Sequence, residues 1–348
     1  MKTLREQINS IFILGYKGVI PPETLKELVL DGLGGVIFFA ENIKERNAFK
    51  NTVADLKAFQ PELITSIDQE GGRVERTKNL PDAIKYIPPL DIIKLPQNLI
   101  ERHYEILSQE LCDFGINMNF APVLDIHTNF DNPVINNRAF GTTADEVIKY
   151  SQIVQNMLHK YSIAAVGKHF CGHGASSVDS HLALPVIDLP MDLLQEHIRP
   201  FTFAVNDGID AIMVAHVHFT AFDKQTVPAS LSKNVINHLK KEIGFSGLII
   251  SDDMVMGGVT SFGSSLDVCI KGIKAGIDMF IFRDTTPGVL QLLSDLEKAA
   301  QDDFELYTKI EEASFKVADF KKNLKTKQVH FDPILARKEI EQIKSSLK

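Results

Sequence analysis

Gly247-Leu248-Ile249-Ile250-Ser251-Asp252-Asp253-Met254 is a stretch in which three large apolar residues lead directly into a pair of carboxylates. A continuous apolar run that follows a glycine is typical of a β-strand buried on both faces, as in a parallel sheet. Adjacent strand residues point to opposite sides, so only one of Asp252 and Asp253 can face the same space. The stretch therefore predicts a buried strand whose last residues carry chemistry.

Short apolar runs followed by longer amphipathic stretches recur along most of the chain. The predicted strands are Ile11–Leu14, Gly35–Phe39, Leu63–Ile67, Ile116–Val123, Ile163–Val166, Ala211–Val214, Leu248–Ile250 and Ile277–Phe282. The predicted helices include Pro21–Leu30, Leu99–Asp113, Ala144–Lys160, Met191–Asn206 and Lys233–Ile243. Strands that alternate with helices pair in parallel through right-handed crossovers. Eight such units predict an α/β fold, a single-domain (β/α)8 barrel of the TIM type, with a doubly wound open sheet as the alternative.

Polar residues follow the apolar runs immediately, and this placement favours the barrel. The segments are Asp68-Gln69-Glu70-Gly71-Gly72, Lys168-His169, His216-Val217-His218 and Asp252-Asp253. In a barrel these positions share the mouth at the C-terminal ends of the strands, where active sites form. No glycine-rich nucleotide-binding motif is present. We expect a catalytic barrel over residues 1–330 and a helical tail over 331–348, packed on the barrel or extending from it.

The composition argues against several classes of partner. The 348 residues include 45 acidic and 37 basic side chains, a formal net charge of −8, which gives no reason to expect nucleic acid or an anionic membrane. Three cysteines cannot build a disulfide framework, which fits a reducing compartment. No apolar run approaches the roughly 20 residues that span a bilayer, and the first residues do not resemble a signal peptide. We expect a cytoplasmic protein.

Polar residues are densest in the segment from Lys168 to His181, KHFCGHGASSVDSH. A packed core needs none of these groups, so the segment indicates a functional loop after a strand. Asp179 and His181 are two residues apart. A carboxylate beside an imidazole fixes its tautomer and stabilises the imidazolium, which suits proton transfer near neutral pH. The alternative is an Asx-turn in which Asp179 caps backbone N–H groups.

Two further segments leave their roles open on spacing alone. A carboxylate at the C-terminal end of a strand, such as Asp252, can be a nucleophile, a metal ligand or a helix cap. In Ser66–Arg76, SIDQEGGRVER, a strand runs into a Gly-Gly turn between carboxylates and arginines. Such a segment suits a structural ion-pair network, and it also suits sugar recognition, because both group types bind hydroxyls with fixed geometry.

Four segments together resemble motifs of glycoside hydrolase family 3. They are IDQEGGRVERT (67–77), NNRAFG (Asn136–Gly141), GKHFCGHGASSVDSH (167–181) and GLIISDDM (247–254). The third resembles the family signature K-H-F-x-G-H-G-x(4)-D-S-H, and the fourth is similar to its nucleophile strand. Their order and approximate separations agree from about residue 10 to 285, which makes the resemblance specific. The subgroup indicated is the bacterial cytoplasmic β-N-acetylglucosaminidase of cell-wall recycling.

The resemblance implies a role for each matching residue. Asp252 would be the nucleophile and Asp253 structural, while His181 would be the general acid/base, paired with Asp179. The residues implied to bind the sugar are Asp68, Arg76, Arg138, Lys168 and His169. The implied reaction is a retaining double displacement through a glycosyl-aspartate, which needs no metal or other cofactor.

The chain departs from the family pattern at two positions. Cys171 stands where the family usually has proline, and Ala175 where an aspartate is common. Neither change removes a residue with an implied catalytic role. Both lie in the loop that carries His181, so they bear on the mobility of that loop.

Several alternative functions are open from the residues. A β-glucosidase of the same family is the nearest alternative. His169 and His173 are four residues apart, and His216-Val217-His218 follows another strand, so a barrel metallohydrolase is a second. A sugar-binding barrel without turnover is a third. The expected substrate is GlcNAc on 1,6-anhydro-MurNAc from muropeptides, a small carbohydrate, and the expected oligomeric state is a monomer.

Overall fold

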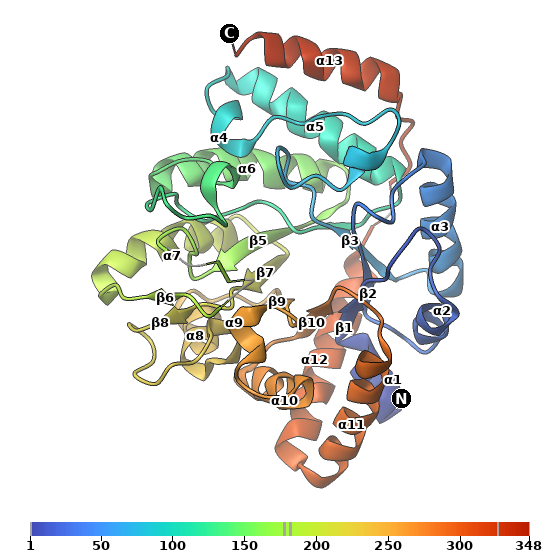
Figure 1. The fold of residues 1–348 in the computed structure, drawn as a ribbon, viewed down its shortest axis with the longest axis vertical. Coiled ribbons are helices and arrows are strands. Elements are labelled where there is room, and N and C mark those ends of the chain that lie inside the picture. Colours follow the sequence, from blue (N-terminus) through green and yellow to red (C-terminus); the bar gives the residue numbers. More distant parts are fainter. Residues whose placement is uncertain (1, 177–178, 181–182, 326, 348) are drawn as a thin grey trace.

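Parallel strands close into a barrel in the computed structural model, which describes residues 2–176, 179–180, 183–325 and 327–347 (Figure 1). Around the ring, the described strands are β1 (Phe12–Leu14), β2 (Gly35–Phe38), β3 (Ile64–Ile67), β4 (Met118–Asn119), β5 (Ala164–Phe170), β7 (Ala211–Val214), β9 (Leu248–Asp253) and β10 (Met279–Phe282). The first and last strands close the ring, with Phe12 of β1 beside Phe280 of β10. The predicted TIM-type barrel is confirmed, and the open doubly wound sheet is wrong.

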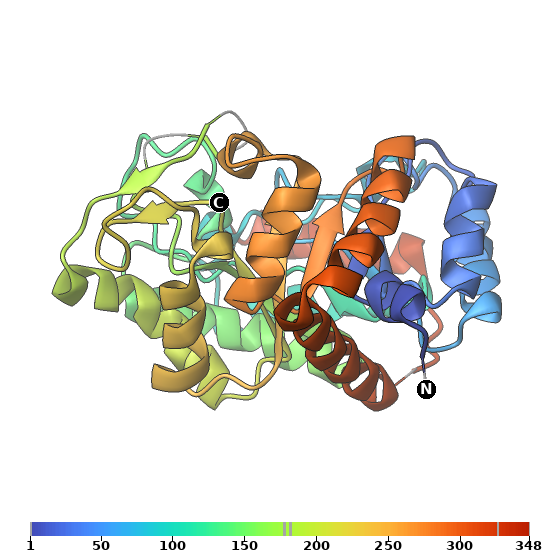
Figure 2. The same ribbon diagram turned by 90° about the horizontal axis from the view of Figure 1, so that it is seen from below.

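Helices surround the ring of strands. They are α1 (Leu4–Ser10), α2 (Glu23–Leu30), α3 (Arg46–Phe59), α4 (Pro89–Ile92), α5 (Gln97–Asp113), α6 (Ala144–Lys160), α7 (Met191–Asn206), α8 (Lys233–Asn237), α9 (Gly257–Thr260), α10 (Ser265–Ala275), α11 (Pro287–Asp302), α12 (Phe304–Asn323) and α13 (Pro333–Ser345). Shorter turns are η1 (Thr77–Asn79), η2 (Asn136–Arg138), η3 (Ala229–Leu231) and the π-helical η4 (His238–Glu242). Helices α10, α11 and α12 pack against one another on one side of the barrel (Figure 2). None of the helices in the described part of the chain combines the length and apolar character needed to cross a bilayer.

Local sequence explains where individual helices begin. Helix α6 starts at the predicted residue because Thr143 and Glu146 form a capping box, in which each side chain accepts a hydrogen bond from the other's backbone N–H. The C-terminal helix α13 lies along α5 (Figure 1). Arg102 of α5 donates to both carboxylate oxygens of Glu339 in α13, at 2.8 and 3.1 Å. Ile340, the next residue of α13, is fully buried.

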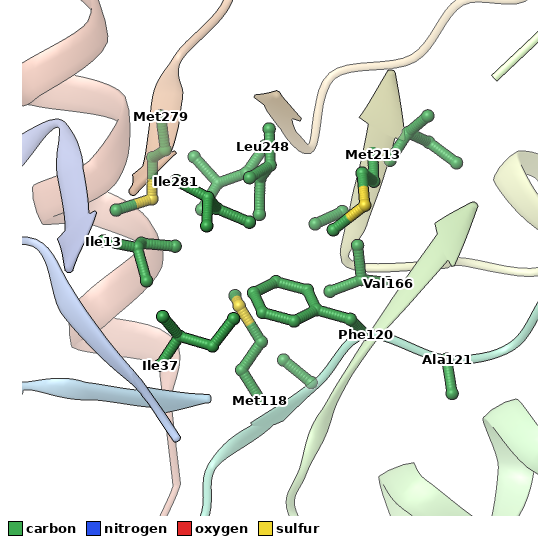
Figure 3. Close-up of a cluster of buried hydrophobic side chains, with 14 of the residues drawn as sticks. Ile13, Ile37, Met118, Phe120, Ala121, Val166, Met213, Leu248, Met279 and Ile281 are labelled. Carbon is green, nitrogen blue, oxygen red and sulfur yellow. The ribbon is translucent and has the colours of Figure 1, made fainter. Parts of the chain in front are cut away.

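Apolar side chains from several strands fill the barrel. Figure 3 shows Ile37, Met118 and Phe120 meeting Met213 and Ile281 in its interior, and all five are buried. Four of them, all except Met118, also line a cavity at the C-terminal ends of the strands. The uppermost layer of the barrel core is therefore the floor of that cavity.

A second, two-stranded parallel sheet lies outside the barrel and has no counterpart among the predicted strands. It pairs β6 (Val186–Ile187) with β8 (His218–Phe219), each of which follows a barrel strand and its loop. Strands of two residues carry too little periodicity to be seen in the sequence. The sheet ties the segment after β5 to the segment after β7.

Candidate active site

An ion-pair network joins the ends of β3 and β5. The ammonium of Lys168 lies 2.7 Å from Asp68 Oδ1 and 2.6 Å from Glu70 Oε1. Glu70 in turn accepts two hydrogen bonds from Arg138, both at 2.8 Å. Burial alone would raise the pKa of Asp68, but Lys168 and Arg76 outweigh burial and hold that pKa well below its usual range. These groups are therefore held charged and in fixed positions.

Arg76 reaches the same network through a tight turn. Gly71 and Gly72 adopt positive φ angles of 101° and 64°, which strain any residue with a side chain. The turn reverses the chain, and Nη2 of Arg76 comes to lie 3.0 Å from Asp68 Oδ2. The Gly-Gly pair after the strand thus places the guanidinium and the carboxylate of one segment against each other.

His169 is oriented by Asp125, a residue that the sequence analysis missed. Asp125 is fully buried, and its Oδ2 lies 2.6 Å from His169 Nδ1 and 3.1 Å from the backbone nitrogen of His169. On the other side of the ring, Nε2 lies 3.4 Å from Nη2 of Arg138. The only signal in the sequence was that Asp125 closely follows an apolar run, as the predicted site residues do. Glu70 likewise lies directly after an apolar run, and nothing in its local sequence distinguishes it from its polar neighbours.

The two carboxylates of β9 have different surroundings. Asp252 lines the cavity, and its Oδ1 accepts a hydrogen bond from the backbone of Asp253 at 2.8 Å. Burial would raise the pKa of Asp252, but the rings of His169 and His216 outweigh it and hold that pKa below its usual range. Burial raises the pKa of Asp253 against the opposing charge of Arg283, whose Nε donates to it at 2.7 Å.

The loop after β5 brings Asp179 to the cavity. Its neighbour Ser180 is held on two sides: Oγ lies 3.0 Å from His173 Nε2, and the carbonyl accepts from the backbone of Gly258 at 3.0 Å. Burial lowers the pKa of His173 to about 4, so that ring is neutral at pH 7. Asp179 lines the cavity beside these groups. His181, the implied acid/base, lies outside the described residues.

One cavity of about 400 Å³ brings these side chains together. Its lining includes every predicted site residue that the structure describes: Asp68, Arg76, Arg138, Lys168, His169, Asp179 and Asp252. It also includes residues that the sequence analysis did not select, among them Phe39, Arg73 and Arg283. Arg73 lies in the segment Ser66–Arg76 noted above without a role of its own, and nothing local assigned a role to Phe39 or Arg283.

Two histidines singled out in the sequence do not line this cavity. His216 is fully buried, with Nδ1 2.7 Å from Ser230 Oγ and Nε2 3.2 Å from the carbonyl of Asp253. His218 lies in β8, with Nδ1 3.1 Å from the carbonyl of Val227. Within the described residues, no group of three or more His, Cys, Asp or Glu side chains is arranged to hold a metal ion.

Known proteins resemble this chain in both sequence and fold. The model of the glycosyl hydrolase family 3 N terminal domain matches residues 3–318. A beta-hexosaminidase of Photobacterium profundum is 34% identical over 292 residues, which cover 82% of this chain and 84% of the relative. One from Psychromonas ingrahamii is 32% identical over 294 residues, covering 82% and 86%. The structure of a glycoside hydrolase family 3 beta-N-acetylglucosaminidase from Paenibacillus sp. str. FPU-7 matches with a TM-score of 0.88 at 29% identity, covering 98% of this chain and 68% of that one. The chain is thus a glycoside hydrolase and belongs to glycosyl hydrolase family 3.

Proposed function

We propose that this chain is a retaining β-N-acetylglucosaminidase that releases terminal, non-reducing β-GlcNAc. The observation that carries the proposal is the position of Asp252, an ionised carboxylate in the same cavity as Asp68, Lys168 and Arg138. The names of the relatives support it, since two are beta-hexosaminidases and the similar structure is of a beta-N-acetylglucosaminidase.

The terminal sugar binds against the buried ion-pair network. Asp68 offers acceptors to hydroxyl groups, Lys168 and Arg138 offer donors, and the buried Glu70 holds the two cations in place. Each of these groups is already held by a partner, so little order is lost when the sugar enters. His169 faces the same space and is kept in one orientation by Asp125.

The reaction proceeds in two displacements. Asp252 attacks the anomeric carbon while His181 donates a proton to the departing glycosidic oxygen, which leaves a glycosyl-aspartate. His181 then takes a proton from water, and the resulting hydroxide releases the sugar with its original anomeric configuration. Asp179 orients the imidazole and stabilises its protonated form. An unperturbed imidazole pKa of about 6.5 suits both halves of the cycle.

The natural substrate we infer is GlcNAc linked to 1,6-anhydro-MurNAc, in the cytoplasmic recycling of peptidoglycan, with the enzyme acting as a monomer. The support is the segment from Lys168 to His181, which resembles the signature of the cell-wall-recycling subgroup and includes its Asp-Ser-His triplet.

Hydrolysis of a matched pair, 4-nitrophenyl β-GlcNAc and 4-nitrophenyl β-glucoside, tests the activity. We expect a higher kcat/KM for β-GlcNAc, whereas a preference for the glucoside makes the chain a β-glucosidase.

A 5-fluoro-GlcNAc donor then tests the nucleophile by peptide mapping. We expect the label on Asp252, with Asp253→Asn still labelled and Asp252→Asn unlabelled; a label on Asp253 would reverse the assignment.

A further inference from the structure

Arg283 stands at the cavity beside the two carboxylates of β9 and has no role in the proposed chemistry. It is the first residue after β10, and its Nε donates to Asp253 Oδ2 at 2.7 Å. Its side chain is 49% exposed, yet it lines the cavity. Among the described residues, neither Nη1 nor Nη2 of Arg283 has a hydrogen-bond partner. Two donor groups of this cation therefore remain available at the cavity, beside Asp253, the residue that follows the proposed nucleophile.

Each of the other Lys and Arg side chains that line the cavity already uses at least one Nη or Nζ group on a protein acceptor. Lys168 binds Asp68 and Glu70, and Arg138 binds Glu70. Arg76 binds Asp68, and Arg73 donates to backbone carbonyls of the 133–135 segment. Arg283 thus leaves both of its Nη groups for a ligand, whereas each of the other cavity-lining Lys and Arg side chains described uses at least one such group on the protein.

Phe39 holds the side chain of Arg283 in place at the mouth. The guanidinium carbon of Arg283 lies 5.8 Å from the centre of the Phe39 ring, and that of Arg76 lies 5.4 Å from the same centre. Contact with the ring and the ion pair with Asp253 fix the plane of the Arg283 guanidinium from two directions. A planar, pre-oriented guanidinium is suited to bidentate binding of a carboxylate.

We propose that Arg283 selects substrates whose aglycone carries a carboxylate. The inference rests on the proposed function, in which the terminal sugar occupies the buried end near Lys168 and the leaving group projects toward the exposed mouth. The aglycone 1,6-anhydro-MurNAc carries a lactyl carboxylate, either free or extended by a peptide that itself ends in carboxylates. A cation at the mouth offsets the unfavourable long-range potential that a net charge of −8 presents to such an anion.

Arg283 could instead act only through Asp253, as a positioning residue for the nucleophile strand. Loss of the guanidinium would then slow every substrate to the same degree, whatever its charge. Selection of an anionic aglycone predicts a different result, in which the loss depends on the charge of the leaving group. The two roles are separable with substrates that differ in that charge alone.

The test compares GlcNAc-1,6-anhydro-MurNAc bearing a free lactyl carboxylate with the same disaccharide converted to the carboxamide. For Arg283→Gln, we expect the carboxylate-to-carboxamide ratio of kcat/KM to fall about tenfold relative to wild type, the scale of one charge-assisted hydrogen bond. Arg283→Lys should retain part of the carboxylate-to-carboxamide ratio, because lysine keeps the positive charge but lacks the paired Nη donors of the guanidinium. In wild type, 1 M NaCl should also lower the ratio, since the interaction is partly exposed.

Arg199→Gln is the matched control, because Arg199 is 42% exposed, is ion-paired to Glu196 and lies on α7 outside the cavity lining. Its ratio should equal that of wild type. An equal loss for both disaccharides in Arg283→Gln, or an unchanged ratio, overturns the inference. Binding of free 1,6-anhydro-MurNAc and its carboxamide, measured by calorimetry, gives the same comparison without turnover. Failure to hydrolyse 4-nitrophenyl β-GlcNAc, by contrast, overturns the proposed function and leaves the binding comparison decisive for Arg283.

Discussion

Asp125 determines which nitrogen of His169 faces the cavity. The carboxylate lies 2.6 Å from Nδ1, and it is fully buried and ionised, so it accepts the Nδ1 proton. Nε2 lies on the opposite side of the ring, 3.4 Å from Nη2 of Arg138. A guanidinium can only donate, so this contact is a hydrogen bond only when Nε2 carries no proton. A residue 44 positions before His169 in the chain thus orients a ring that lines the cavity.

Replacement of Asp125 by Asn should therefore impair binding and turnover while the barrel stays folded. An amide cannot accept at both of its polar atoms, so it cannot serve both His169 Nδ1 and the backbone of His173, which now bind separate oxygens. We expect kcat/KM for 4-nitrophenyl β-GlcNAc to fall about 10²-fold, the cost of a displaced site group. Asp131→Asn, an exposed residue of the same loop, is the control. Wild-type kinetics in Asp125→Asn would show that the ring needs no such partner.

Replacement of His181 should matter most for substrates with poor leaving groups. A nitrophenolate leaves with little protonation, whereas a sugar alkoxide needs a proton in the transition state. We expect a plot of log kcat/KM against leaving-group pKa to be steeper for His181→Ala than for wild type across a series of aryl β-GlcNAc substrates. Asp179→Asn should change the slope in the same direction but less, because Asp179 does not transfer the proton itself. A slope for His181→Ala no steeper than that of wild type would assign the proton to another residue.

Activity should survive removal of metal ions, because the proposed steps use only side chains and water. We expect exhaustive dialysis against EDTA to leave kcat/KM for 4-nitrophenyl β-GlcNAc unchanged. Addition of zinc to the dialysed protein should not increase the rate. Activity that is lost on dialysis and restored by zinc would favour the barrel metallohydrolase considered from the sequence.

Glu75 should make the protein less stable at alkaline than at acidic pH. Its carboxyl is buried and accepts the backbone N–H of Tyr86 at 2.6 Å, and burial raises its pKa from 4.5 to about 7. The folded state thus binds this proton more tightly than the unfolded state. The resulting stabilisation is complete below pH 4.5 and is lost as the pH rises to about 7.

Glu75→Gln keeps the acceptor without the charge, so it should raise the free energy of unfolding at pH 8 by roughly 3 kcal/mol. At pH 4 the variant and wild type should have equal stability. Urea unfolding at the two pH values makes the comparison, with the exposed Glu27→Gln as control. Equal effects of Glu75→Gln at both pH values would contradict the raised pKa.

Local sequence was sufficient to predict the barrel and several of the polar side chains that line its cavity. The spacing of apolar residues over a few positions indicates whether a segment is a strand or a helix. Helices α6 and α7 begin and end where that spacing predicts. A parallel barrel also collects the strand ends at one mouth, so residues just after the apolar runs had to meet there. Asp68, Lys168 and Asp252 were found in this way.

Which groups pair with which was decided only by the tertiary structure. Lys168 meets an aspartate 100 residues earlier in the chain, and Arg283 meets Asp253 across two neighbouring strands. Such contacts depend on how the ring of strands closes and on how each loop packs over it, and these are properties of the whole chain. Asp125 and Arg283 follow apolar runs as the predicted residues do, but no short motif distinguishes them. Their roles follow from distances and burial, which a linear sequence does not contain.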